Sequence, residues 1–168
     1  MTFVELREEL LRIDTVNHPT TEREPAHVHP VQESGAEVTS GSLVFEVGGT
    51  ERRLGPGESI QIPANTPHRF WNDGEEDARS VQWFRPALDI ASFFETFAVL
   101  AQQNKIDRRG MPKPMQLAVM VTEFSQELRP VSPPWPVVRA LGAILGPIAR
   151  RRGYRARLSV SQDAAPRG

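Results

Sequence analysis

Turn signals at close intervals divide the middle of the chain into short segments of alternating polarity. Five strand-like runs lie at residues 42–47, 50–54, 59–62, 70–71 and 80–84. Glycine and proline separate these runs, and the pair Gly48-Gly49 predicts a tight hairpin between the first two. Many short strands with such punctuation are typical of a β-sandwich or β-barrel. We therefore expect an all-β core over residues 10 to about 86.

The hydrophobic period changes from strand-like to helical after Pro86. Apolar side chains recur at helical spacing in three groups: Ile90, Phe93, Phe94, Phe97 and Leu100; Leu117, Val121, Phe124 and Leu128; and Val137, Leu141, Ile144 and Ile148. Each group predicts a helix with one apolar face, to be buried on the barrel wall, another helix or a second subunit. Gly146-Pro147 should kink or end the third helix. The expected organisation is a barrel at 1–86, two or three helices as an extension at 87–157, and a loose tail at 158–168.

Composition narrows the class of protein. A chain of 168 residues can bury one core, and a net charge of −1 gives no reason to expect a nucleic-acid partner. No cysteine is present, so disulfide and thiolate chemistry are excluded. The start lacks a signal-peptide pattern, and the longest apolar stretch near the end is interrupted by Arg139, Gly146 and Pro147. We expect no transmembrane segment and a cytoplasmic location.

Arginine is concentrated near the end of the sequence. From Pro130 onward there are seven arginines and a single acidic residue, Asp163. A solvated helix terminus accounts for such a cluster, because cations suit the C-terminal end of a helix dipole. A patch facing lipid or a protein partner is the alternative.

Three of the four histidines stand in positions suited to a metal site. His27 and His29 are two residues apart, so in an extended chain both rings point to the same side. His68 follows the turn at residues 63–67, which can bring a third imidazole from another strand. Imidazole nitrogen is a common ligand of divalent transition metals. These residues are the predicted metal ligands.

The sequence around these histidines resembles the two motifs of the cupin superfamily. The first motif is present as His27-Val28-His29-Pro30-Val31-Gln32-Glu33, followed by Gly41. The second is present as Gly57, Pro63-Ala64-Asn65, His68 and Asn72, with Asn65 where the family has glycine. Asparagine tolerates positive φ better than other non-glycine residues, so the turn should survive. The helical part also resembles a subgroup of single-domain cupins with a C-terminal helical extension.

This resemblance implies a jelly-roll barrel, also called a double-stranded β-helix. It implies a divalent metal, one of iron, manganese, nickel, copper and zinc, held by three histidines and one glutamate. Activities in the family range from dioxygenases, isomerases and decarboxylases to binding proteins without turnover. The fold alone therefore does not determine the reaction.

The glutamate of the first motif is displaced by one residue. Counting back from Gly41 by the family spacing reaches Ser34, not Glu33, and a shift of one residue in a strand turns a side chain to the opposite face. The small residues Ser34 and Ala36 share one face, which favours them as inward and Glu33 as outward. A bulge or tighter loop could restore Glu33 as a fourth ligand.

The predicted pocket is therefore a reduced metal site with extra space beside it. Its expected walls include Ser34, Ala36, Phe45 and Phe70. Gln61 and Gln82 interrupt otherwise apolar strands. We place both on a solvent face; the alternative is that they point inward and donate to a bound ligand. One functional hypothesis is a metal-dependent enzyme acting on a small organic molecule, and the resemblance to the cupins implies dioxygenase-like chemistry. The other is a binding or sensing barrel without turnover and with a degraded or absent metal site. A homodimer is expected in both cases, because sheet edges and apolar helix faces need covering.

Overall fold

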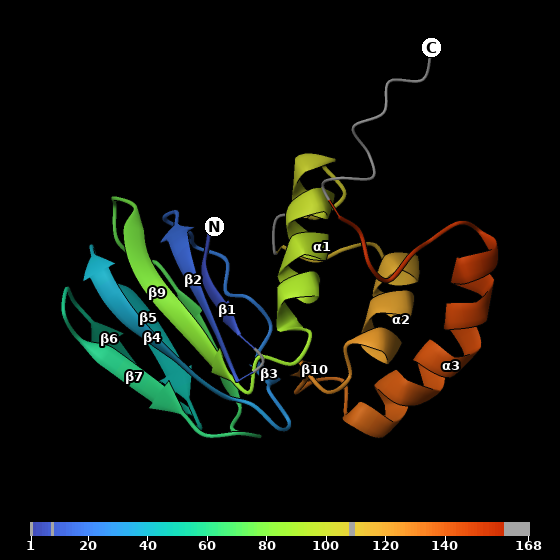
Figure 1. Cartoon of the computed structure of the whole chain (residues 1–168), viewed down its shortest axis with the longest axis horizontal. Helices are drawn as coiled ribbons and strands as arrows, with labels where there is room; N and C mark the ends of the chain where they lie inside the picture. Colours follow the sequence, from blue (N-terminus) through green and yellow to red (C-terminus); the bar gives the residue numbers. More distant parts are fainter. Residues whose placement is uncertain (1, 8, 108–109, 160–168) are drawn as a thin grey trace, which may run out of the picture.

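The computed structural model describes residues 2–7, 9–107 and 110–159, so most of the predicted tail at 158–168 lies outside the described residues. The strands are β1 (Thr2–Arg7), β2 (Leu10–Asn17), β3 (His27–Val28), β4 (Glu33–Ser40), β5 (Leu43–Val47), β6 (Thr50–Leu54), β7 (Ser59–Ile62), β8 (His68–Trp71), β9 (Ala78–Arg85) and β10 (Arg129–Pro130). The helices are α1 (Ile90–Gln102), α2 (Pro114–Glu123) and α3 (Trp135–Arg151). Strands form one side of the molecule and the helices the other (Figure 1).

Two five-stranded sheets enclose the core of the β part. Their strand orders are β1-β2-β9-β4-β7 and β10-β3-β8-β5-β6, with every described pairing antiparallel. Alternate residues point inward, and the buried cluster between the sheets includes Val38, Leu43, Phe45, Leu54 and Ile62. The predicted all-β jelly-roll core is confirmed. Strand β1 was not anticipated, because the first seven residues carry no turn signal of their own.

The helical part is joined to the barrel by packing and by a strand. Leu11 and Ile13 of β2 are fully buried against Phe84 and against Ile90 at the start of α1. Strand β10, which lies between α2 and α3, pairs with β3 at the edge of the second sheet. A second apolar cluster then holds the helices together: Leu100, Val119, Met120, Phe124 and Ala149.

The third helix differs from prediction in the face that it buries. It does not end at Gly146-Pro147, one of the two predicted alternatives, but continues to Arg151 although Pro147 cannot donate a hydrogen bond to residue 143. Its predicted apolar face is not buried within the chain: the exposed fractions are 48% for Val137, 48% for Leu141, 65% for Ile144 and 40% for Ile148. The physical reason is that Val138, Gly142, Gly146 and Ala149 form the face that is buried.

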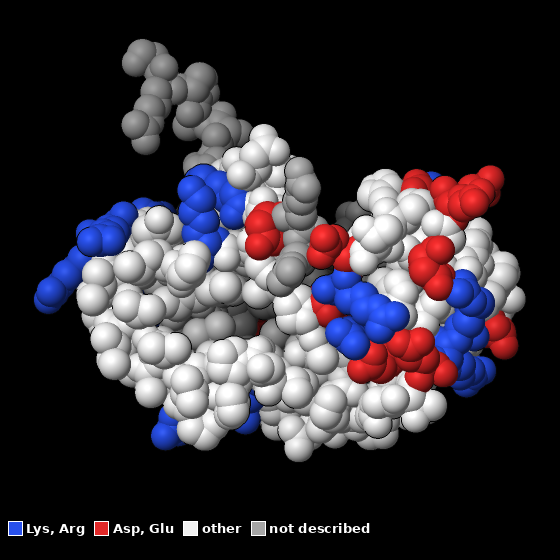
Figure 2. Space-filling view, turned by 180° about the vertical axis from the view of Figure 1, so that it is seen from behind, with Lys and Arg blue, Asp and Glu red and all other residues white. Residues whose placement is uncertain are grey.

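The barrel and the helical extension differ in the charge of their surfaces. Figure 2 shows acidic and basic side chains intermixed on the barrel side, whereas the end formed by α3 shows Lys and Arg around an uncharged surface. Among the described residues, no helix combines the length and the hydropathy needed to cross a bilayer.

Candidate metal centre and cavity

The three predicted ligands converge because β3 and β8 are neighbouring, hydrogen-bonded strands of one sheet. His27 begins β3, His68 begins β8, and the two residues are partners in the antiparallel register. His29 follows β3 and lies on the same side of the chain as His27. The ring centroids are 4.5 Å apart for His27 and His68, 5.3 Å for His27 and His29, and 5.2 Å for His29 and His68. One ring nitrogen from each histidine lies within 4.8 Å of the other two.

Hydrogen bonding defines which nitrogen of each ring is available. The Nδ1 atoms lie 3.3 Å from Pro25 O for His27, 2.5 Å from Glu127 O for His29, and 2.8 Å from Thr66 O for His68. A carbonyl oxygen only accepts, so a neutral ring in each of these contacts carries its proton on Nδ1. Each Nε2 then keeps its lone pair. Histidines that ligate metals are usually oriented in this way by a partner on the other nitrogen.

The surroundings also keep the rings neutral. Burial lowers the pKa of His27 well below its usual value, and the neighbouring His68 and His29 lower it further. Burial lowers the pKa of His29 to about 4, against the opposing effect of its bond to Glu127 O. Burial likewise lowers the pKa of His68. Three neutral imidazoles are in the protonation state that metal binding requires.

The donor set therefore fits a divalent transition metal, although no carboxylate belongs to the cluster in the described part of the chain. Glu33 is not brought to the histidines: its carboxylate accepts a hydrogen bond from Gln61 Nε2 at 2.7 Å on the exposed side of the sheet. Ser34 is buried and lines the cavity, as the strand alternation predicts. No bulge interrupts β4 at this point, because Glu33, Ser34 and Gly35 pair with β9 in continuous register.

A cavity of about 650 Å³ opens beside the three rings and extends toward the helices. Ser34, Ala36, Phe45 and Phe70, the predicted pocket residues, all line it. The helices add further apolar walls: Phe93, Phe94, Phe97, Leu117, Val121, Phe124, Leu141 and Leu145. The cavity is thus shared between the barrel and the helical extension.

The prediction that Gln82 faces solvent is wrong. Gln82 lines the cavity and is only 8% exposed, because it has the same strand parity as the buried Ser80 and Phe84. Its Nε2 lies 3.5 Å from Thr15 Oγ1. The hydroxyl of Ser34 is also buried and has no hydrogen-bond partner among the described residues. Two polar side chains are thus available to a molecule in a mostly apolar cavity.

Sequence reasoning missed Glu24, which is the acidic side chain among the described cavity-lining residues. Burial raises its pKa to about 7, although the Phe70 N–H, 3.4 Å from Oε1, and the charge of Arg69 act in the opposite direction. A carboxyl group with this pKa can gain or lose a proton near neutral pH. Glu24 lies in an irregular loop, so no periodicity in the sequence indicates which way it points.

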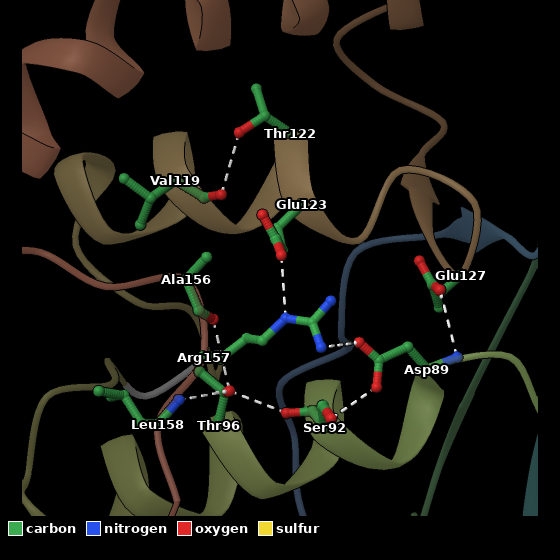
Figure 3. Close-up of polar contacts among 10 residues, drawn as sticks. All are labelled: Asp89, Ser92, Thr96, Val119, Thr122, Glu123, Glu127, Ala156, Arg157 and Leu158. Carbon is green, nitrogen blue, oxygen red and sulfur yellow. Dashed lines mark hydrogen bonds and ion pairs between the residues drawn. The ribbon is translucent and has the colours of Figure 1, made fainter.

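The extension also contributes to the site through residues that follow α2. The backbone carbonyl of Glu127 accepts a hydrogen bond from His29 Nδ1. The side-chain Oε1 of Glu127 lies 3.3 Å from the backbone N of Asp89 at the start of α1. Arg157 ties the same region together by pairing with Asp89 at 2.5 Å and with Glu123 at 2.9 Å (Figure 3). The position of one histidine ring therefore depends on how the helices are held.

Comparison with known proteins shows which family model and which proteins the barrel is similar to. Residues 15–84 match the family model of the cupin domain. Protein SchB of Streptomyces halstedii is 35% identical over 60 residues, which cover 36% of this chain and 44% of SchB, so less than half of that relative is spanned. Among solved structures, TT1209 of Thermus thermophilus is 26% identical and matches 51% of this chain and 80% of its own, with a TM-score of 0.47. KdgF of Halomonas sp. is 23% identical, and the match covers 54% of this chain and 80% of KdgF, with a TM-score of 0.49.

Proposed function

Because residues 15–84 match the model of the cupin domain, we propose that the chain is a cupin and that it binds one divalent transition metal through His27, His29 and His68. The observation that carries the proposal is the hydrogen bonding of the three rings. Each Nδ1 faces a backbone carbonyl, so three Nε2 lone pairs are directed away from protein partners. Iron, manganese, nickel, copper and zinc all accept imidazole ligands, and the donor set does not select among them.

The same site would bind a small organic molecule beside the metal. The cavity walls are mainly aromatic and aliphatic, which suits an apolar body. Three neutral histidines leave the charge of a divalent metal uncompensated, so an anionic or enolisable group on the ligand would add the missing negative charge. The unpartnered Ser34 hydroxyl and the Gln82 amide can hydrogen-bond to that group.

We further propose dioxygenase-like chemistry on this ligand. A bound metal would supply Lewis acidity or a centre for activating oxygen. The chain's own residues would exclude water with the apolar walls, orient the ligand through Ser34 and Gln82, and hold or accept a proton at the carboxyl of Glu24. The position of Glu24 in the cavity wall supports the proton transfer, and the choice of dioxygenase-like chemistry rests on the resemblance to the cupin family.

A binding or sensing barrel without turnover is the second candidate. The observation in its favour is that no carboxylate joins the three histidines in the described chain, which removes the anionic ligand of the family motif. A homodimer and a cytoplasmic location stay predictions from the sequence.

Oxygen consumption distinguishes the two candidates. The purified protein is loaded with iron(II) and given a panel of small enolisable acids and ketones under air. An enzyme consumes oxygen with at least one compound, and Glu24→Gln slows that turnover while retaining iron. Ligand binding without oxygen uptake across the panel would instead favour the sensing barrel. A protein that takes up no metal under these conditions would refute the proposed metal site and the enzyme, and would favour the sensing barrel with an absent metal site.

A further inference from the structure

The outer face of α3 is unusually apolar for a surface helix. Val137, Leu141, Ile144 and Ile148 follow each other at intervals of four, three and four residues, which places them in one line along the helix. All four are among the exposed large hydrophobic residues of the described chain. The remaining exposed residues of α3 are either small or cyclic apolar residues or arginines: Pro136, Arg139, Ala140, Ala143, Pro147, Arg150 and Arg151.

The opposite face of α3 explains why the large side chains remain outside. A Cβ atom added at Gly142 would lie 2.9 Å from Thr122 Cγ2 of α2, and one added at Gly146 would lie 3.6 Å from Ala118 O. Gly142 therefore lets α3 approach α2 closely, because a larger residue there would require Thr122 to shift, whereas a Cβ at Gly146 would be in ordinary van der Waals contact. Burying glycine and exposing isoleucine reverses the usual order for a helix in water. The same arrangement is found in helices that contact lipid, where small residues pack against protein and large aliphatic residues face the hydrocarbon.

The charged residues of α3 and of the described segment around it are all arginines. The described residues from Leu128 to the end of the described chain include no Asp or Glu. Arg139 lies on α3 itself, and Arg150, Arg151 and Arg152 lie at its C-terminal end, all of them exposed. Figure 2 shows the resulting surface at the α3 end of the molecule, with blue at its margins and no red. A bound surface with negative charge would complement it.

From these observations we propose that the exposed face of α3 docks the protein on anionic lipid membranes. The helix would lie in the plane of the surface, with Ile144 and Ile148 among the acyl chains and the arginines at the headgroups. Leu141, which also lines the cavity, would lie at the border of this face. Hydrophobic burial supplies one part of the binding free energy, and each arginine near an anionic surface strengthens binding about five-fold.

A second copy of the chain is a less suitable occupant of this face. In a two-fold interface the same patch contacts itself, so each subunit presents arginines and no acidic residue from this segment to its partner. Apolar contacts could still form, but the charges would oppose them. Anionic lipid satisfies both the apolar stripe and the positive margin.

The test is sedimentation of the full-length protein with vesicles of phosphatidylcholine alone and of equal parts phosphatidylcholine and phosphatidylglycerol. We expect binding to the anionic vesicles, weaker binding at high salt and little binding to the neutral vesicles. Ile144→Glu should weaken binding about ten-fold or more. Arg150→Ala and Arg151→Ala should each weaken it about five-fold.

Two matched variants on the barrel serve as controls. Val31→Glu changes an aliphatic side chain that is 52% exposed, and Arg52→Ala removes an exposed arginine; neither should alter vesicle binding. Ile144→Ala is a milder second variant, in case the glutamate perturbs folding. Equal sedimentation with neutral and anionic vesicles would overturn the proposal, as would wild-type binding by the Ile144 variants. A dimer in analytical ultracentrifugation that dissociates on Ile144→Glu, without vesicle binding, would assign the face to self-association instead.

Discussion

Strands β5 and β6 of the barrel bury the large side chains of Leu43, Phe45 and Leu54. Helix α3 buries Val138 and the small residues Gly142, Gly146 and Ala149, while its isoleucines at 144 and 148 stay exposed. The barrel thus follows the usual relation between side-chain size and burial, and α3 reverses it. The difference teaches that one apolar pattern can specify a core in one region and an outer contact surface in another, depending on which face has room for a close neighbour.

Truncation of a large apolar side chain should lower the free energy of unfolding much more in the barrel than on the exposed face of α3. Leu54→Ala removes a fully buried side chain and should lower the free energy of unfolding by about 2–5 kcal/mol. Ile144→Ala should change it by no more than about 0.5 kcal/mol, since Ile144 is 65% exposed. Urea unfolding of both variants measures the contrast. Similar losses would mean that Ile144 is covered in solution, and the comparison would fail.

Acid should destabilise the metal-free barrel through its histidines. The pKa of His29 is lowered to about 4 in the fold, so the unfolded chain binds more protons than the folded one between pH 6.5 and 4. The free energy of unfolding therefore decreases as the pH falls through this range, by about 3 kcal/mol for His29 alone. Urea unfolding of chelator-treated protein at several pH values measures the loss.

Glu24 should affect the pH dependence of the free energy of unfolding in the opposite direction from His29. Its pKa is raised to about 7, so its folded carboxyl holds a proton more tightly than the unfolded one, and stability is lost as pH rises from about 4.5 to 7. The acid loss should therefore be steeper in Glu24→Gln than in the wild type. An unchanged slope in this variant would show that the pKa of Glu24 is not raised in the fold.

The link between the extension and the metal centre should have an intermediate effect. Glu127→Ala removes the Oε1 contact to Asp89 N and loosens the turn whose carbonyl holds His29. We expect metal affinity to fall about ten-fold, measured by competition with a chromophoric chelator. Glu127→Gln keeps the acceptor oxygen and should restore most of the affinity. Unchanged affinity in Glu127→Ala would mean that the helices do not orient the ring.

The ion pairs of Arg157 should matter least. Arg157→Leu breaks contacts to Asp89 and Glu123, but the arginine side chain is 56% exposed, so water screens both pairs. The expected loss of stability is about 1 kcal/mol or less. Arg53→Leu, which breaks an exposed pair with Asp73 in the barrel, is the matched control and should cost a similar amount. A much larger loss for Arg157 would indicate that the helices depend on it to stay docked.

Local patterns were sufficient to predict much of the barrel. Alternation and turn residues predicted strands at β5, β6 and β7, and the parity of Ser34 and Ala36 predicted which side of β4 faces the cavity. The same parity argument, applied from Phe84, would have placed Gln82 inward. These features depend on neighbours one or two residues away, which a sequence displays directly.

Other features depend on contacts between distant segments. Glu24 reaches the cavity from an irregular loop, and the carbonyl of Glu127 meets His29 across 98 positions of sequence. No period or motif records such approaches. The helical spacing of α3 predicted an apolar face, but only the close packing of Gly142 on α2 decides that this face points outward.

The most direct test of the central claim is the cobalt(II) content of each chain, measured by mass spectrometry after saturation and desalting. The wild type should retain one ion per chain, and His27→Ala, His29→Ala and His68→Ala should each retain far less. His18→Ala, which changes an exposed histidine beside Asp77, should retain as much as the wild type. Full retention of cobalt by the His68 variant, or none by the wild type, would contradict the account.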